Sequence, residues 1–376
     1  MSKLTRYLYD KNAVRLSLLN AILKKDNNRS LFWFFELYYS KLYDESVSLI
    51  YRIFCLFYLT TNFNFTKILN TNISLWRQTN DIKPLADIIY NLTLLNKDHR
   101  STQPFIILQT INKNNNKIIL YRGRKPKWCA NFPTKYLQIL QSINKRHYQN
   151  IYYYSKYLID SELFQIIVQY FDIVENKTVG EIDSLLEILD ATDAFSAIIL
   201  TLCIANHSSS DSTDTLQLYS CDEELIDAIY ENNCLNITPV RDTIIHKRIF
   251  KVDESIGAFN NQCFTYPEII EVLINWEKNA LNTPLWNERF QKYNCRVAKG
   301  DEGDDDGEEQ FYELYGFEPD EMPKEVELSG FCYIDYSARD WLKNYIYDGD
   351  GNGNGNGNGN GILNEKMDLT TIKLQF

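Results

Sequence analysis

The chain has 376 residues, of which 44% are hydrophobic and 14% aromatic, and its formal net charge at pH 7 is −11. This length exceeds the size at which one hydrophobic core stops growing, so we expect two or three structural units. The net negative charge excludes a protein that coats nucleic acid with its whole surface.

Apolar residues recur at helical spacing through the first hundred residues. Residues 10–25 predict a helix capped by Asp10. The aromatic-rich segment 29–61 predicts two more helices, the first capped by Ser30 and the second starting at Asp44. Because their connection is short, we expect an antiparallel helical hairpin whose aromatic side chains form a core. A partner-facing aromatic groove is the alternative use of those side chains.

The run SLFWFFELYYSKLYDESVSLIYRIF within this segment resembles an aromatic helical signature of an uncharacterised protein group of the nucleocytoplasmic large DNA viruses. The resemblance covers only this stretch, and it implies no activity, cofactor or site residue. It implies a viral origin, which the abundance of Asn, Ile, Lys and Tyr also suits, because AT-rich genomes produce that bias. AT-rich cellular genomes produce the same bias.

The remaining elements are helical apart from one short exception. A polar break at 61–72 precedes a helix that begins near Pro84. The Ile-rich runs 105–111 and 117–121 flank the turn-forming sequence NKNNN and predict a β-hairpin. Helical spacing resumes at Pro133 and recurs through the second half. We therefore expect a mainly α protein, an irregular helical bundle or helical-repeat-like array with one small β-hairpin insertion.

Changes in composition divide the chain into seven predicted segments. From 301 to 327 thirteen Asp or Glu stand against one Lys, which predicts a solvated, mobile connection, and a Gly-Asn repeat further on predicts a flexible tether. The segments are an N-terminal helical unit (1–100), a basic β-hairpin plus helix segment (101–160), a second helical unit (161–298), an acidic linker (299–330), a C-terminal helix (331–348), the Gly-Asn tether (349–361) and an apolar docking tail (362–376).

Positive charge is concentrated in one stretch. Residues 99–159 contain eleven Lys or Arg and no Asp or Glu, whereas the whole chain has 39 basic and 50 acidic residues. Aromatic residues are interleaved with these cations. Cations that hold phosphates and aromatic faces that stack on bases are the two ingredients of single-strand binding. The predicted nucleic-acid-binding residues are Arg122, Arg124, Lys125, Lys127, Trp128, Lys135, Lys145, Arg146 and Lys156.

Within that stretch, RGRKPKW at 122–128 resembles an AT-hook, in which an extended Arg-Gly-Arg enters a narrow, strongly negative minor groove. It departs from the usual Arg-Gly-Arg-Pro core because Lys125 precedes Pro126. The alternative is an exposed hairpin exit that is basic by chance.

Other functional classes leave no signature in the sequence. There is no GxxxxGK[ST], HExxH or GxSxG, so we predict no enzyme, no cofactor and no small-molecule substrate, with a fold-assembled active site as an open alternative. Eight cysteines are scattered without a CxxC, which predicts reduced, buried thiols and no metal site. No segment is apolar enough to span a bilayer and no signal peptide is evident, so we predict a cytoplasmic or nuclear protein that is not secreted.

The leading prediction is a non-enzymatic adaptor or scaffold that binds nucleic acid or a nucleoprotein complex through residues 99–159. The alternative is a structural or virion-associated protein-interaction module of a large DNA virus, with protein partners held by the aromatic helices and the tail. The predicted partner-binding residues of the tail are Leu369, Ile372, Leu374 and Phe376.

Overall fold

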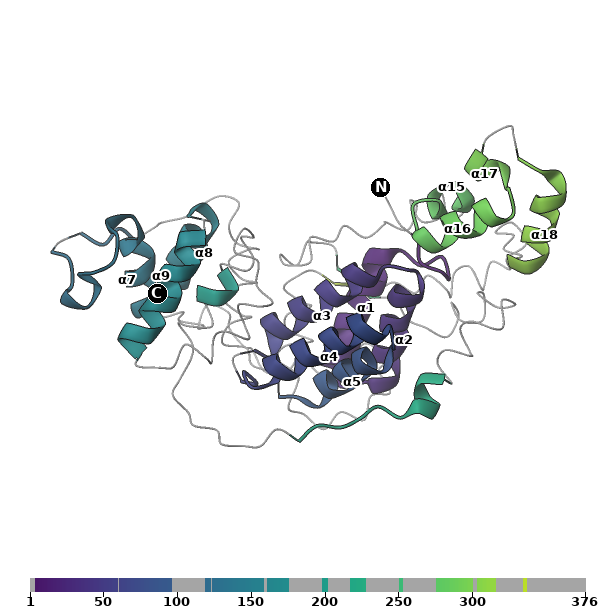
Figure 1. Cartoon of the computed structure of the whole chain (residues 1–376). Coiled ribbons are helices and arrows are strands. Elements are labelled where there is room, and N and C mark those ends of the chain that lie inside the picture. The colour runs from purple at the N-terminus through teal and green to yellow at the C-terminus, as the bar shows by residue number, and fades with distance from the viewer. Residues whose placement is uncertain are drawn as a thin grey trace. The chain divides into compact units, whose positions relative to one another are not determined.

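The computed structural model describes residues 4–59, 61–96, 119–122, 124–158, 161–175, 198–201, 217–227, 250–252, 275–299, 303–315 and 334–336. Contacts divide the chain into two units, residues 1–99 with 211–342 and residues 100–210 with 343–376. The described part of each unit is mainly helical (Figure 1), so the predicted fold class is confirmed. Among the described residues, none of the helices has the length and apolar character needed to cross a membrane.

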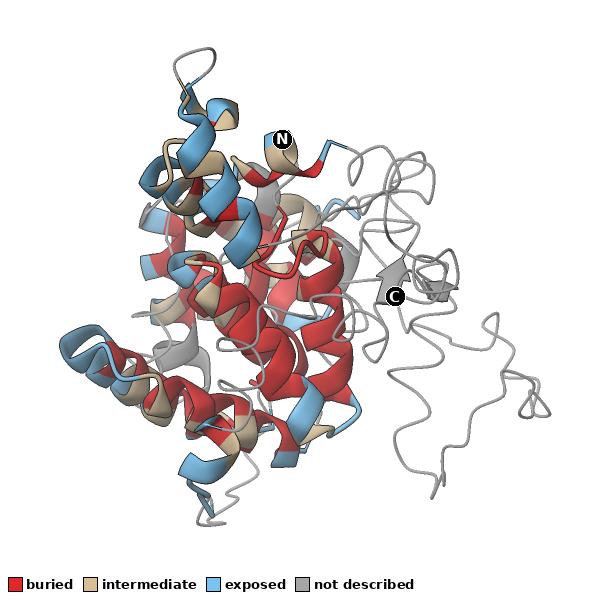
Figure 2. Cartoon of the chain, turned by 90° about the vertical axis from the view of Figure 1, so that its right-hand side faces the viewer, coloured by how far each residue is buried: buried red, intermediate tan, exposed pale blue. Residues whose placement is uncertain are grey.

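A bundle of helices forms the core of the first unit. Its helices are α1 (Lys11–Leu23), α2 (Asn27–Tyr39), α3 (Tyr43–Phe57), α4 (Phe65–Thr79) and α5 (Lys83–Leu94). Helix α2 contacts α1, α3 and α5, and α4 packs on α5. Buried residues fill long stretches of the packed helices in Figure 2. Phe34, Phe35, Phe54 and Phe57 are all 0% exposed, so the aromatic segment forms a core, as predicted, and these four side chains line no groove.

Of the two predicted N-cap residues, Asp10 and Ser30, the structure confirms Asp10 only. The Asp10 carboxylate accepts the Asn12 N–H at 3.0 Å and caps α1, as predicted. Helix α2 is capped by Asp26, not by Ser30, because the Asp26 carboxylate accepts the Arg29 N–H at 3.0 Å. Ser30 lies in the first turn, where its hydroxyl donates to the Asp26 carbonyl. Both residue types are good caps, so the carboxylate nearer the N-terminus adds a turn to the helix.

The predicted polar break at 61–72 was wrong, because α4 begins at Phe65. This helix buries Phe65, Leu69, Ile73 and Trp76 along one face, whereas the polar residues between them are mostly exposed or half-buried. One apolar residue per turn is enough for an amphipathic helix when that stripe packs on a neighbour. Helix α5 carries Pro84 in its first turn, as predicted.

A segment far along the sequence, 217–222, lies against α5. The Asn91 amide accepts the Tyr219 N–H at 2.9 Å and donates to the Tyr219 carbonyl at 2.6 Å. One turn earlier, the Asp87 carboxylate accepts the Cys221 N–H at 2.6 Å, and Lys83 donates to the Cys221 carbonyl at 2.8 Å. Side chains on one helix face therefore satisfy the backbone of a segment that has no regular secondary structure.

A second cluster of helices also belongs to the first unit. It contains α15 (Trp276–Ala280), α16 (Pro284–Lys292), α17 (Arg296–Lys299) and α18 (Asp305–Tyr315). Trp276, Trp286, Phe290 and Phe311 pack with Leu4 and Leu8 of the N-terminal turn. The indole N–H of Trp286 donates to the Thr5 carbonyl at 2.9 Å. Thr283 and Pro284 begin α16, as predicted.

Part of the predicted acidic linker, 299–330, is a helix and not a mobile connection. Residues 305–315 form α18, and Phe311 on this helix is 0% exposed. Asp305, Asp306 and Glu308 lie in the first turn, where negative charge is favoured by the helix dipole. The acidic residues therefore form the first turn of a helix that contributes Phe311 to the core. Residues 316–330 and the Gly-Asn tether lie outside the described residues.

The β prediction is not supported. Residues 105–118 lie outside the described part, and 119–122 have no regular secondary structure. Elsewhere two three-residue strands, β1 (Phe250–Val252) and β2 (Ile334–Tyr336), pair in parallel in the first unit.

The second unit is a smaller group of helices. It contains η1 (Lys127–Cys129), η2 (Thr134–Tyr136), α7 (Leu137–Asn144), α8 (Tyr148–Tyr157) and α9 (Ser161–Glu175). Helices α7 and α8 contact each other, and the turn that begins at Pro133 leads into α7, as predicted. Its buried side chains include Tyr136, Ile139, Leu140, Ile143, Ile151, Leu163, Ile167 and Tyr170.

Candidate nucleic-acid interface

The segment 119–122 is attached to helices α7 and α8 by two side-chain amides. Asn150 accepts the Ile119 N–H at 3.1 Å and donates to its carbonyl at 2.7 Å. Gln138 does the same for Tyr121, at 3.0 Å for both bonds. Ile119, Leu120 and Arg122 are exposed, whereas Tyr121 is half-buried.

The next turn is closed by Lys125. Its ammonium group donates to the carbonyls of Ala130 and Phe132 at 2.8 and 2.7 Å. Lys125 was predicted to bind nucleic acid, but these bonds show that it also holds the loop together. Gly123 lies outside the described residues, so the extended Arg-Gly-Arg of an AT-hook stays a prediction.

Trp128 in η1 is fixed by an aromatic neighbour. Its indole packs edge-to-face on Tyr170 of α9, with ring centroids 5.4 Å apart and planes at 73°. The Tyr170 hydroxyl accepts a hydrogen bond from the Asn144 amide at 3.3 Å. Trp128 itself is half-buried, so part of its surface remains open to solvent.

Lys145 is held at the end of α7 by Tyr121. Its ammonium nitrogen lies 4.6 Å from the centroid of the Tyr121 ring, a cation–π arrangement. The same ring stacks on His147 at 5.8 Å and 17°, and the Tyr121 hydroxyl hydrogen-bonds to His147 Nδ1. Burial and the nearby Lys145 charge lower the pKa of His147, so the imidazole is neutral at neutral pH.

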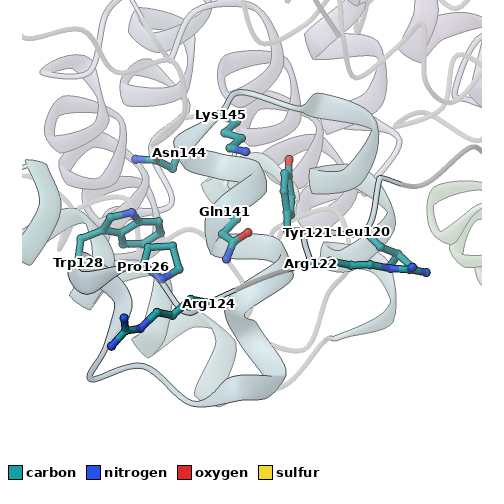
Figure 3. Close-up of a pocket in the computed structure, with 9 residues that line it drawn as sticks. All are labelled: Leu120, Tyr121, Arg122, Arg124, Pro126, Trp128, Gln141, Asn144 and Lys145. Atoms are coloured by element: carbon teal, nitrogen blue, oxygen red, sulfur yellow. The ribbon is translucent and has the colours of Figure 1, made fainter.

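These residues surround an open pocket of about 340 Å³ (Figure 3). Arg122, Arg124, Trp128 and Lys145 of the predicted site come together here. The amides of Gln141 and Asn144 on α7 also line it, and in Figure 3 Gln141 lies between Trp128 and Tyr121. The full lining comprises Leu120, Tyr121, Arg122, Arg124, Pro126, Trp128, Gln141, Asn144 and Lys145.

The other predicted binding residues lie outside the pocket lining. Lys127 is exposed in η1, and Arg146 is exposed just beyond α7. Lys135 instead forms an ion pair of 2.5 Å with Glu162, and this hydrogen bond raises the pKa of Lys135. The side chain of Lys156 lies outside the described residues. The role of Lys156 in binding thus stays a prediction. The charge of Lys135 is matched by the Glu162 carboxylate.

Sequence reasoning missed Glu162, Gln141 and Asn144. Glu162 lies beyond the acid-free stretch, and only the packing of α9 brings it to Lys135. Gln141, Asn144 and Lys145 share one face of α7 at i, i+3 and i+4 spacing, opposite the buried Ile139 and Ile143. That amphipathic pattern was the available signal.

The electrostatics of the remaining cations are simple. Arg122, Arg124, Lys127, Lys145 and Arg146 are exposed, and none of them forms an ion pair with a described carboxylate. Among the residues that the structure describes, no group of His, Cys, Asp and Glu could hold a metal ion. The predicted tail residues Leu369, Ile372, Leu374 and Phe376 lie outside this part.

In comparisons with known proteins, no family model, no curated protein and no solved structure matches the chain.

Proposed function

We propose that the protein is a non-enzymatic adaptor that binds nucleic acid through the basic face of its second unit. The basic face is defined by Arg122, Arg124, Lys127, Lys145 and Arg146. The observation that carries the proposal is that these five exposed side chains come from a sequence stretch without Asp or Glu and form no ion pair with a described carboxylate. Exposed cations without a described carboxylate partner attract phosphates because binding releases condensed counterions.

The supporting geometry goes beyond net charge. Segment 119–122 is held by four hydrogen bonds from Gln138 and Asn150, so the backbone that carries Arg122 is fixed before any ligand arrives. Lys145 is placed by its contact with Tyr121. Preorganised cations lose less side-chain entropy on binding than free ones. The aromatic Trp128 beside them supplies a surface on which a base can stack.

The test replaces Arg122, Arg124, Lys127 and Lys145 with alanine in the full chain. We expect weaker binding of labelled single-stranded and duplex oligonucleotides, measured by fluorescence anisotropy over a range of salt concentrations. The slope of log affinity against log salt should decrease in magnitude by about 3, the value expected when about four phosphate contacts are lost.

The matched control removes four other exposed cations, Lys24, Lys67, Arg77 and Lys278, all of them in the first unit. It changes the net charge by the same amount, so it should leave the salt slope nearly unchanged. The proposal fails if the first variant keeps the wild-type affinity and slope, or if both variants lose affinity equally. Capture of a protein partner that survives nuclease treatment would instead favour a protein-interaction module.

A further inference from the structure

The pocket on the basic face combines an aromatic surface with polar groups. Trp128 lies at one side and packs edge-to-face on Tyr170, and the amides of Gln141 and Asn144 of α7 also line the pocket. In Figure 3 the side chains of Arg122 and Arg124 lie on different sides of Gln141 and extend away from it in roughly opposite directions. Cations thus stand on either side of a space that is also lined by the rings of Trp128 and Tyr121.

The Gln141 amide is available to a ligand. Among the described residues it makes no hydrogen bond, whereas Gln138, one turn earlier, uses its amide on the backbone of Tyr121. A free amide presents one acceptor and two donors in a plane. This set matches the edge of a nucleobase, which also presents donors and acceptors in a plane.

We infer that this pocket takes one unpaired nucleobase and that the ligand of the basic face is therefore single-stranded nucleic acid. This inference rests on the proposed function. The base stacks on Trp128, its edge meets Gln141, and the phosphates on its two sides lie at Arg122 and Arg124. A base inside a duplex is stacked and paired, so it cannot enter unless it is first turned out of the helix.

The test compares three probes with the full-length protein. They are a short single-stranded oligonucleotide, an abasic oligonucleotide with the same number of phosphates, and a duplex of the same length. We expect the intact single strand to bind about 5- to 150-fold more tightly than the abasic strand, which corresponds to about 1–3 kcal/mol for one stacked base. The salt slopes of these two probes should be equal.

Two variants locate the effect. Trp128→Leu should lower the affinity for the intact strand to that of the abasic strand without changing the abasic affinity, and Trp128→Phe should restore most of the difference. The protein's affinities for single-stranded homopolymers of each of the four bases should differ, because Gln141 meets the edge of the base. Gln141→Leu should reduce these differences. Its control, Gln78→Leu, changes an exposed glutamine of α4 and should reduce nothing.

The outcomes separate this inference from the proposed function. If intact and abasic strands bind equally, and the cation variant weakens both, phosphate binding stands and the base pocket is wrong. Equal loss of both probes in Trp128→Leu, with Trp128→Phe no better, also overturns the base pocket. If neither strand shows salt-dependent binding that the cation variant weakens, the proposed function itself is wrong.

Discussion

Glu36 is an acidic side chain with no exposed surface, and its charge is balanced inside the first unit. One carboxylate oxygen accepts from Arg6 Nε at 2.9 Å, and the other accepts the Tyr7 N–H at 3.0 Å. The Arg6 guanidinium also lies over the rings of Tyr7 and Tyr39, 4.8 and 4.9 Å from their centroids. At the residue scale, this pair joins the N-terminal turn to α2.

We predict that Glu36→Gln lowers the free energy of unfolding by about 3–5 kcal/mol, because it removes the carboxylate charge that the buried Arg6 guanidinium contacts at 2.9 Å. The matched control is Glu45→Gln, which breaks the 2.7 Å pair with Lys11, where the side chains are 37% and 18% exposed. That change should cost about 0–1 kcal/mol. Urea unfolding followed by circular dichroism measures both, and equal losses would contradict the prediction.

At the element scale, α18 shows how a highly charged sequence becomes part of a core. Its acids occupy the solvent side and the first turn, whereas Phe311 packs on Trp276 and Phe290, with ring centroids 6.4 and 4.8 Å away. Gly307 permits a close approach to α16, since a Cβ at this position would lie 2.0 Å from the Tyr293 carbonyl oxygen. The position of α18 therefore depends on the large side chain of Phe311 and on the absence of a Cβ at Gly307.

We expect Phe311→Ala to destabilise the first unit by about 3–5 kcal/mol, the usual cost of removing a buried phenyl ring. The neighbouring Gln310 is exposed on the same helix, so Gln310→Ala should change stability by no more than about 0.5 kcal/mol. Chemical denaturation of the two variants compares them directly. If residues 305–315 were a solvated connection, as the sequence first indicated, the two substitutions would have the same small effect.

At the scale of the whole molecule, charge and thiols are distributed differently. Positive charge is gathered in one stretch of an acidic chain. The four described cysteines, in contrast, are spread over both units, and all of them are buried and free. Burial raises the pKa of each, to about 12 for Cys55 and about 11 for Cys221 and Cys295. Each thiol therefore stays protonated near neutral pH.

We predict that iodoacetamide at pH 8 modifies Cys55 at least tenfold more slowly in the native protein than in urea, because alkylation requires an exposed thiolate. Peptide mass spectrometry at several times measures the rate at each cysteine. Cys129, Cys221 and Cys295 should also be protected, while the denatured protein should react fully at all positions. Native labelling of Cys55 at the denatured rate would contradict the buried arrangement.

Local patterns account for what could be predicted. The caps at Asp10 and Thr283 and the start of α3 were placed correctly, or within one residue, because a cap needs only neighbouring residues. Within the candidate site, the exposure of Arg122 and Arg124 was expected from a stretch without acids. Helix α18 was missed because its burial depends on tryptophans of other elements, which a charge count does not include.

The sequence by itself determined the helical class, the aromatic core of 29–61 and the concentration of cations in one stretch, because periodicity and charge are properties of residues near one another in the chain. Tertiary structure decided which cations remain available. Packing of α9 gives Lys135 a carboxylate, whereas amides on α7 and α8 hold the segment that carries Arg122. These outcomes depend on contacts between separate elements, whose geometry is fixed only when the chain folds.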